Sequence, residues 1–211
     1  MITPKLSEVQ FDAISRHINT NGVELLVSDF NGVLDDYYGT KYEFLASVLG
    51  PQHRDQHFAR LALQTDTAYI SDRSATLEGT ITSYCANNAI TISRTGQALL
   101  ETGPRKPEIT GEAKKFLGDL TVPTVIFTAQ SSERLYQSVG QEFLEDLGIG
   151  VVTSVAKPSV DALAAVLSAR NTVSGVACMV GDGLIDDLLP AKLLGMQTLL
   201  VSPFADAHAS L

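Results

Sequence analysis

Four polar residues have side chains of types that can bind or react with anions, and three of them lie at the ends of apolar runs. Asp29, Thr128 and Asp182 lie at the ends of such runs, and Lys157 precedes a predicted helix. A carboxylate at a strand end, followed by a glycine turn, can act as a nucleophile with backbone N–H groups around the incoming anion. The Thr128 hydroxyl can donate to a phosphoryl oxygen, and Lys157 can neutralise charge between a carboxylate and a phosphate.

The acidic residues of this set also predict a metal site. Asp29 and Asp182 offer hard carboxylate oxygens, and Asp186 and Asp187 follow closely after Asp182. Such ligands, completed by water and phosphate, suit the octahedral coordination of Mg²⁺. The expected cofactor is therefore Mg²⁺.

Alternating strands and helices are expected to position these residues. The predicted strands are continuous apolar runs at 23–30, 121–128, 149–152, 175–180 and 198–201. Helical patterns occur at 6–18, 110–118, 131–147, 158–169 and 186–194. This alternation is typical of an α/β fold with a doubly wound parallel sheet covered on both faces. Ligands of such sheets bind outside the carboxyl ends of the strands, where the polar residues above are expected to meet.

The segment 37–106 interrupts this alternation and is predicted to be a mostly helical cap domain. Its helix-like stretches lie near 41–49, 53–65, 74–88 and 95–101, and it closes with a stiff Gly-Pro-Arg-Lys-Pro connection. Residues 1–36 and 107–211 are then expected to form the α/β core domain. Tyr37 and Tyr38, at the junction, could line the site or pack the hinge.

Composition narrows the classes of partner. The 211 residues carry a net charge of −9, which disfavours nucleic-acid binding because that binding needs clustered Lys and Arg. No apolar segment is long enough to span a bilayer, and the first residues do not read as a signal peptide. Two distant cysteines, Cys85 and Cys178, indicate neither a disulfide framework nor a metal cluster. We expect a cytoplasmic protein whose partner is a small molecule and not a nucleic acid or a membrane.

Taken in order, the polar residues resemble the four motifs of the haloacid dehalogenase (HAD) superfamily. Residues 29–34 match the first motif except at its second acid, Thr128 matches the second, Lys157 the third, and Asp182 with Asp187 the fourth. The resemblance covers nearly the whole chain and implies a Rossmann-like core with a helical, C1-type cap. It also implies that Asp29 attacks phosphorus and forms an aspartyl-phosphate, while Thr128 and Lys157 steady the transferring group.

The same resemblance implies a set of metal ligands. Mg²⁺ would be held by the Asp29 carboxylate, the backbone carbonyl of Asn31 and the Asp182 carboxylate. Either Asp186 or Asp187 would support this shell, and the sequence does not decide between them.

Asn31 is the departure from the family pattern. In the phosphatases of the family this position is an aspartate, which first acts as general acid and then as general base for water. Asn31 can hydrogen-bond and orient, but it cannot donate or accept a proton at neutral pH. General acid–base catalysis contributes about 10²–10⁴-fold, so phosphate monoesters are expected to turn over slowly.

Several functions remain compatible with Asn31. The substrate could be an acyl phosphate, whose leaving group needs little protonation, or the enzyme could stop at, or transfer from, the phosphoenzyme. The chain could be a catalytically impaired module that binds a ligand or a protein, or the asparagine could have been introduced deliberately. The dehalogenase and phosphonate-cleaving branches also lack the acid. The former use no metal, and the latter need a cap lysine, for which Lys41 is poorly placed.

The sequence thus favours a Mg²⁺-dependent phosphohydrolase or phosphotransferase that acts on a small phosphorylated metabolite. The identity of the metabolite and the oligomeric state are not predicted.

Overall fold

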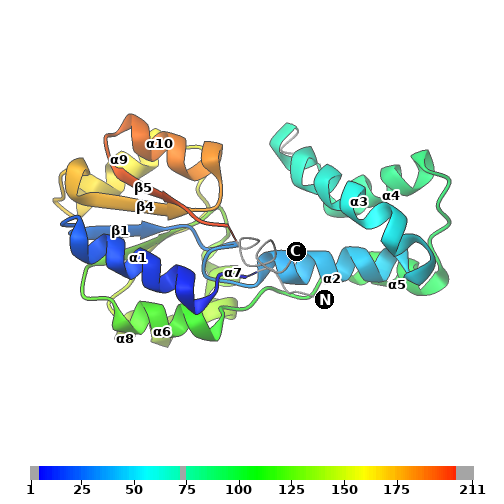
Figure 1. Cartoon of the computed structure of the whole chain (residues 1–211), viewed down its shortest axis with the longest axis horizontal. Helices are drawn as coiled ribbons and strands as arrows, with labels where there is room; N and C mark the ends of the chain where they lie inside the picture. The colour runs from blue at the N-terminus through cyan, green and yellow to red at the C-terminus, as the bar shows by residue number, and fades with distance from the viewer. Residues whose placement is uncertain (1–4, 72–74, 203–211) are drawn as a thin grey trace. The chain divides into compact units, whose positions relative to one another are not determined.

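The structure, a computed structural model of the chain, describes residues 5–71 and 75–202 (Figure 1). The chain divides into two compact units. The first comprises Met1–Tyr38 with Pro107–Leu211, and the second comprises Gly39–Lys106. Among the described residues, none of the helices combines the length and the hydropathy that crossing a bilayer requires.

A five-stranded parallel sheet forms the centre of the first unit, which confirms the predicted fold class. Its strand order is β3-β2-β1-β4-β5. The strands are β1 (Leu25–Ser28), β2 (Thr124–Phe127), β3 (Gly150–Val152), β4 (Ala177–Gly181) and β5 (Gln197–Leu200). Because Ser28 at the end of β1 pairs with Ile126 on one side and Val180 on the other, the carboxyl ends of the three central strands are level. The strand order reverses direction between β1 and β4, and such a switch point is where ligands bind in open α/β sheets.

Helices cover both faces of the sheet (Figure 1). One face carries α1 (Glu8–Thr20), α6 (Gly111–Asp119), α7 (Ser132–Val139) and α8 (Gln141–Asp146). The other carries α9 (Val160–Ala169) and α10 (Leu189–Leu193). Successive residues of a strand point to opposite faces, so Leu26 packs into the first layer and Leu25 into the second. Both strand faces are buried, which explains why the strands read as continuous apolar runs.

Two helical segments differ from the sequence prediction. The single helix expected at 131–147 is two helices, α7 and α8, which are separated at Gly140, where φ is +92°. A positive φ ends helical geometry, and glycine adopts it without steric cost. The helix expected at 186–194 begins earlier, with one π-helical turn at Leu184–Leu188, and continues as α10.

The second unit is made of helices with an apolar core of its own. They are α2 (Tyr37–Leu49), which begins in the first unit, α3 (Pro51–Ser71), α4 (Leu77–Asn87) and α5 (Arg94–Thr102). The side chains of Thr76 and Ser93 cap α4 and α5 by accepting backbone N–H groups of the first turn. The largest fully buried side chains of this unit are Leu45, Leu61 and Ile81.

Candidate functional site

The backbone of the first unit brings the predicted site residues to one edge of the sheet. Asp29 follows β1 directly, and its N–H donates to the Val180 carbonyl at 2.9 Å, so the ladder with β4 extends to this residue. Thr128 extends the ladder between β2 and β3 in the same way, with its N–H 2.9 Å from the Val152 carbonyl. Asp182 follows β4 directly. Sheet hydrogen bonds therefore fix the nucleophile candidate and its neighbours.

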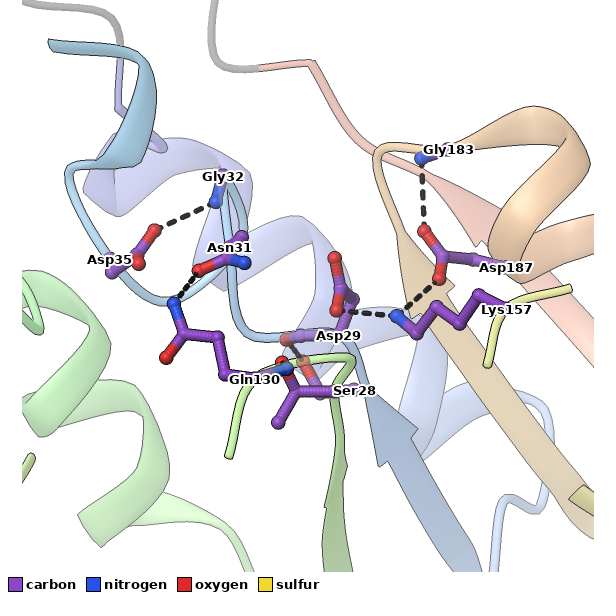
Figure 2. Close-up of polar contacts among 10 residues, drawn as sticks. Ser28, Asp29, Asn31, Gly32, Asp35, Gln130, Lys157, Gly183 and Asp187 are labelled. Carbon is purple, nitrogen blue, oxygen red and sulfur yellow. Dashed lines mark hydrogen bonds and ion pairs between the residues drawn. The ribbon is translucent and has the colours of Figure 1, made fainter. Parts of the chain in front are cut away.

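Lys157, in the loop between β3 and α9, lies between two carboxylates (Figure 2). Its Nζ is 2.6 Å from Asp29 Oδ1 and 2.7 Å from Asp187 Oδ1. All three side chains are buried, with exposed fractions of 7% for Lys157, 9% for Asp29 and 2% for Asp187. The Lys157 ammonium also lies 5.5 Å from the centroid of the Phe127 ring. A buried, doubly paired lysine of this kind is held in one place and keeps its charge.

The π-helical turn after β4 places Asp187 close to Asp29 and Asp182. These three aspartates and Lys157 are called the cluster below. Asp187 Oδ2 accepts the Gly183 N–H at 3.0 Å, while Oδ1 pairs with Lys157. The chain approaches itself so closely that a Cβ atom on Gly181 would lie 2.5 Å from Asp187 Cβ, so this position requires glycine. Asp186 is half-buried and is not one of the three clustered aspartates. Of the two candidates, it is therefore Asp187 that lies with Asp29 and Asp182.

The cluster carries excess negative charge. Asp29, Asp182 and Asp187 contribute three negative charges and Lys157 one positive charge, which leaves −2 when all four are ionised. Burial raises the pKa of Asp29 to about 7, although the Lys157 charge opposes the shift and the neighbouring aspartates add to it. Burial likewise raises the pKa of Asp182 to about 6, against a hydrogen bond from Tyr38. Burial alone would lower the pKa of Lys157, but the charges of Asp29 and Asp187 raise it above its usual value.

The three carboxylates fit a divalent cation. One oxygen from each of Asp29, Asp182 and Asp187 lies within 4.8 Å of the others. In the part of the chain that the structure describes, this is the one group of three or more His, Cys, Asp or Glu side chains so arranged. Hard oxygen donors with uncompensated negative charge are the ligands that Mg²⁺ prefers.

Asn31 lies beside this cluster and is held by a residue that the sequence did not single out. Its Oδ1 accepts a short hydrogen bond from Gln130 Nε2 (Figure 2). Gln130 is itself fixed by Thr128, whose Oγ1 accepts the Gln130 N–H at 3.2 Å. Thr128 is fully buried, so besides its expected role toward a phosphoryl oxygen it shapes the loop after β2.

A second unpredicted residue, Asp35, secures the turn that carries Asn31. Asp35 Oδ1 accepts the N–H groups of Gly32, at 2.8 Å, and Tyr37, at 3.1 Å. Gly32 has φ +73°, and a Cβ atom there would lie 2.5 Å from the Tyr38 ring and 2.6 Å from Asp182 Oδ2. Burial raises the pKa of Asp35 well above its usual value, although both N–H groups oppose the shift.

The only sequence signal for Gln130 and Asp35 was their position shortly after the ends of predicted strands. Gln130 stands two positions after Thr128, and Asp35 stands four positions after Asn31. Polar types at such places are common, and their contacts join segments as far apart as 99 residues. The remaining cap candidate, Lys41, is buried in α2 within the second unit.

Comparison with known proteins gives matches in structure. No protein-family model matches the sequence, and no curated protein matches it. A haloacid dehalogenase-like family hydrolase from Xanthomonas campestris is 18% identical and has a TM-score of 0.53; the match covers 87% of this chain and 83% of that one. A dehalogenase structure is 14% identical with a TM-score of 0.59, and the match covers 86% of each chain. The HAD-type hydrolase YfnB from Bacillus subtilis, solved with bound magnesium, is 16% identical with a TM-score of 0.51, over 85% of this chain and 86% of that one.

These similarities establish the fold. The parallel sheet with its covering helices is the architecture of HAD-like hydrolases. The resemblance that the four sequence motifs indicated is therefore confirmed at the level of the fold.

Proposed function

We propose that this chain is a Mg²⁺-dependent phosphohydrolase or phosphotransferase that forms an aspartyl-phosphate on Asp29 and acts on a small phosphorylated metabolite. The observation that carries the proposal is the buried cluster in which Lys157 lies 2.6 Å from Asp29 and 2.7 Å from Asp187, with Asp182 as the third carboxylate. Bound Mg²⁺, held by these three aspartates, would neutralise charge on the transferring phosphoryl group. The HAD-like fold and the magnesium bound to YfnB support this assignment.

The residues of the chain itself account for the first chemical step. An Asp29 carboxylate oxygen attacks phosphorus, and the bond between phosphorus and the leaving-group oxygen breaks, so the leaving group takes the electron pair. Lys157 contacts the attacking carboxylate and compensates the charge of the incoming anion. The Thr128 hydroxyl orients the phosphoryl group. Phosphoryl transfer depends mainly on positioning and charge compensation, which are the services that these side chains provide.

The second step returns the nucleophile. A water oxygen, or the hydroxyl of an acceptor, attacks phosphorus and the bond to Asp29 breaks, which restores the carboxylate. The attacking group loses its proton to solvent or to the phosphate product, because Asn31 cannot accept it. This step is therefore expected to be slow, which favours accumulation of the phosphoenzyme.

The charge of the cluster favours a metal-assisted reaction over metal-free dehalogenation. When all four groups are ionised, three carboxylates and one ammonium leave −2, which repels an anionic haloacid unless a cation is bound. A module that binds a phosphorylated ligand without turnover shares the same charges and differs only in the absence of the covalent intermediate.

The decisive experiment follows the covalent intermediate. The protein is incubated with acetyl phosphate or p-nitrophenyl phosphate, with Mg²⁺ or with EDTA, and the intact mass is measured after acid quench. One added phosphoryl group that requires Mg²⁺, maps to Asp29 and is missing in Asp29→Asn supports the proposal. A folded protein that binds phosphate but acquires no phosphoryl group from either donor would be the binding module.

Protons and Mg²⁺ compete for the same carboxylates, so the affinity for Mg²⁺ is expected to depend on pH. A protonated carboxyl is neutral and is a poor ligand for the metal. Because the pKa values of Asp29 and Asp182 are raised to about 7 and about 6, protons occupy both groups at lower pH, and the affinity is expected to rise with pH and level off above about 7. Calorimetric titration with Mg²⁺ from about pH 5 to about pH 8 measures this directly. An affinity that stays constant over this range would contradict the assignment of these carboxylates as ligands.

A further inference from the structure

Asn31 is oriented by its neighbours and is not free to rotate. Its Oδ1 accepts the hydrogen bond from Gln130 Nε2, which commits the other end of the carboxamide, Nδ2, to the opposite direction. Figure 2 shows this nitrogen on the side that faces Asp29. An amide nitrogen carries two N–H donors and no acceptor. A neutral hydrogen-bond donor, Asn31 Nδ2, therefore faces the space beside Asp29 in which the phosphoryl group must bind.

The orientation of Gln130 follows from the hydrogen bonds it makes and from one that it lacks. Its backbone N–H is held by Thr128 Oγ1, which fixes the loop. Its Oε1 is buried and has no hydrogen-bond partner. If the amide were turned over, the buried position would hold two unsatisfied N–H donors in place of one unsatisfied acceptor, at a higher desolvation cost. The observed orientation, with Nε2 toward Asn31, is thus the less costly one.

We propose that Gln130 is a positioning residue that presents the Asn31 N–H to the leaving-group oxygen, and that the site therefore takes acyl phosphates in preference to phosphate esters. The proposal rests on the proposed function of Asp29 as nucleophile. An N–H stabilises negative charge on a departing oxygen but transfers no proton to it. A carboxylate leaves as a stable anion with its electron pair, whereas an alkoxide or phenoxide needs a proton. A mixed anhydride of a carboxylic acid and phosphate is the class of substrate that such a site can cleave.

Two substitutions at the same position separate orientation from simple packing. Gln130→Met keeps the length of the side chain and removes the donor, so Asn31 is free to rotate. Gln130→Glu keeps a hydrogen bond, but a carboxylate only accepts, so Asn31 must turn Nδ2 toward it and present Oδ1 to the site. A purely structural role predicts that Glu is tolerated at least as well as Met. Our proposal predicts the reverse order.

The measured quantity is the single-turnover rate at which Asp29 is phosphorylated, with acetyl phosphate, p-nitrophenyl phosphate and phenyl phosphate as donors in order of increasingly basic leaving groups. The unchanged protein is expected to react fastest with acetyl phosphate. Gln130→Glu is expected to lower that rate by about 10²-fold, the usual effect of losing one transition-state donor, and Gln130→Met to lower it less. Repulsion by the added charge of Glu appears in the concentration of acetyl phosphate needed for saturation, and loss of the donor appears in the maximal rate.

A matched control and a spectroscopic measurement complete the test. Gln97→Glu makes the same change on the exposed surface of the second unit and should leave every rate unchanged. With Mg²⁺ and fluoroberyllate, which mimics the phosphorylated aspartate, the side-chain N–H signals of Asn31 should shift in the unchanged protein and not in Gln130→Glu. Equal rates in the unchanged protein and both Gln130 variants would overturn this inference and leave the proposed function intact. Absence of phosphorylation with all three donors would overturn both.

Discussion

Asn31→Asp is expected to raise the turnover of phenyl phosphate by about 10²–10⁴-fold, the range that a positioned general acid–base contributes. The aspartate could protonate the departing phenoxide and then take a proton from the attacking water. Gln130 Nε2 is already placed to donate to an oxygen at this position, so the new carboxyl would be held where Asn31 Oδ1 now lies. Phosphorylation by acetyl phosphate should gain much less, because acetate leaves without a proton. Steady-state and burst kinetics with both donors measure the two effects.

The controls for this variant separate catalysis at the site from contamination. Asp29→Asn/Asn31→Asp carries the new acid without the nucleophile and should be inactive. Asn171→Asp makes the same change at an exposed residue between α9 and β4 and should behave like the unchanged protein. If Asn31→Asp stays inert while it binds Mg²⁺ normally, the chain is a binding module whose pocket no longer supports turnover.

Lys157→Met is expected to lower the free energy of unfolding of the metal-free protein by about 3–5 kcal/mol, the usual cost of removing one partner from a buried ion pair. The change leaves Asp29 and Asp187, with exposed fractions of 9% and 2%, without their cation. Lys157 opposes the rise in the pKa of Asp29, so without it that pKa would lie still further above its ordinary value in the folded chain. Stability conferred by a raised pKa is present at low pH and is lost as pH rises through the folded pKa. The loss should therefore be small near pH 4 and should grow as pH rises through and above about 7.

Urea unfolding with EDTA at about pH 4 and at about pH 8 measures this effect. Lys5→Met is a matched control, since Lys5 pairs with Glu112 at 2.7 Å but both side chains are about a third exposed or more. Exposed pairs contribute roughly 0–1 kcal/mol, and this variant should show no comparable dependence on pH. A Lys157→Met protein as stable as the unchanged one at about pH 8 would contradict this expectation and would mean that the buried carboxylates do not depend on the lysine charge.

The sheet could be predicted because its strands are buried on both faces and carry unbroken apolar runs. All five strands lie within or close to the predicted ranges, and even the three-residue β3 was visible in its run. The helix boundaries depend on single backbone angles, which residue patterns do not reveal. Gly140 stands within an otherwise helical pattern, and only its φ of +92° separates α7 from α8. The π-helical turn before α10 likewise depends on the contacts of Asp187 with Gly183 and Lys157.

The candidate site could be predicted in part, because its residues follow strands whose ends are level. Asp29, Lys157, Asp182 and Asp187 come together as side chains in contact or close to it. The choice between Asp186 and Asp187 could not be made, since adjacent residues differ only in the direction that the helical turn gives them. Gln130 could not be found either, because its importance lies in which atom of an amide meets Asn31, and that is a property of the folded loops.

The turn that carries Asn31 also bears on the chemical ageing of the chain. Asparagine followed by glycine loses ammonia readily, because the glycine nitrogen can reach the side-chain carbonyl carbon with no Cβ in the way. In the folded chain the Gly32 N–H is bound to Asp35 Oδ1 at 2.8 Å, and the Asn31 Oδ1 is bound to Gln130. Attack by the Gly32 nitrogen would have to break its hydrogen bond to Asp35, and the hydrogen bond from Gln130 restricts rotation of the Asn31 carboxamide toward that nitrogen. The folded state thus protects Asn31, whereas an unfolded chain would gradually deamidate there and give isoaspartate as well as aspartate.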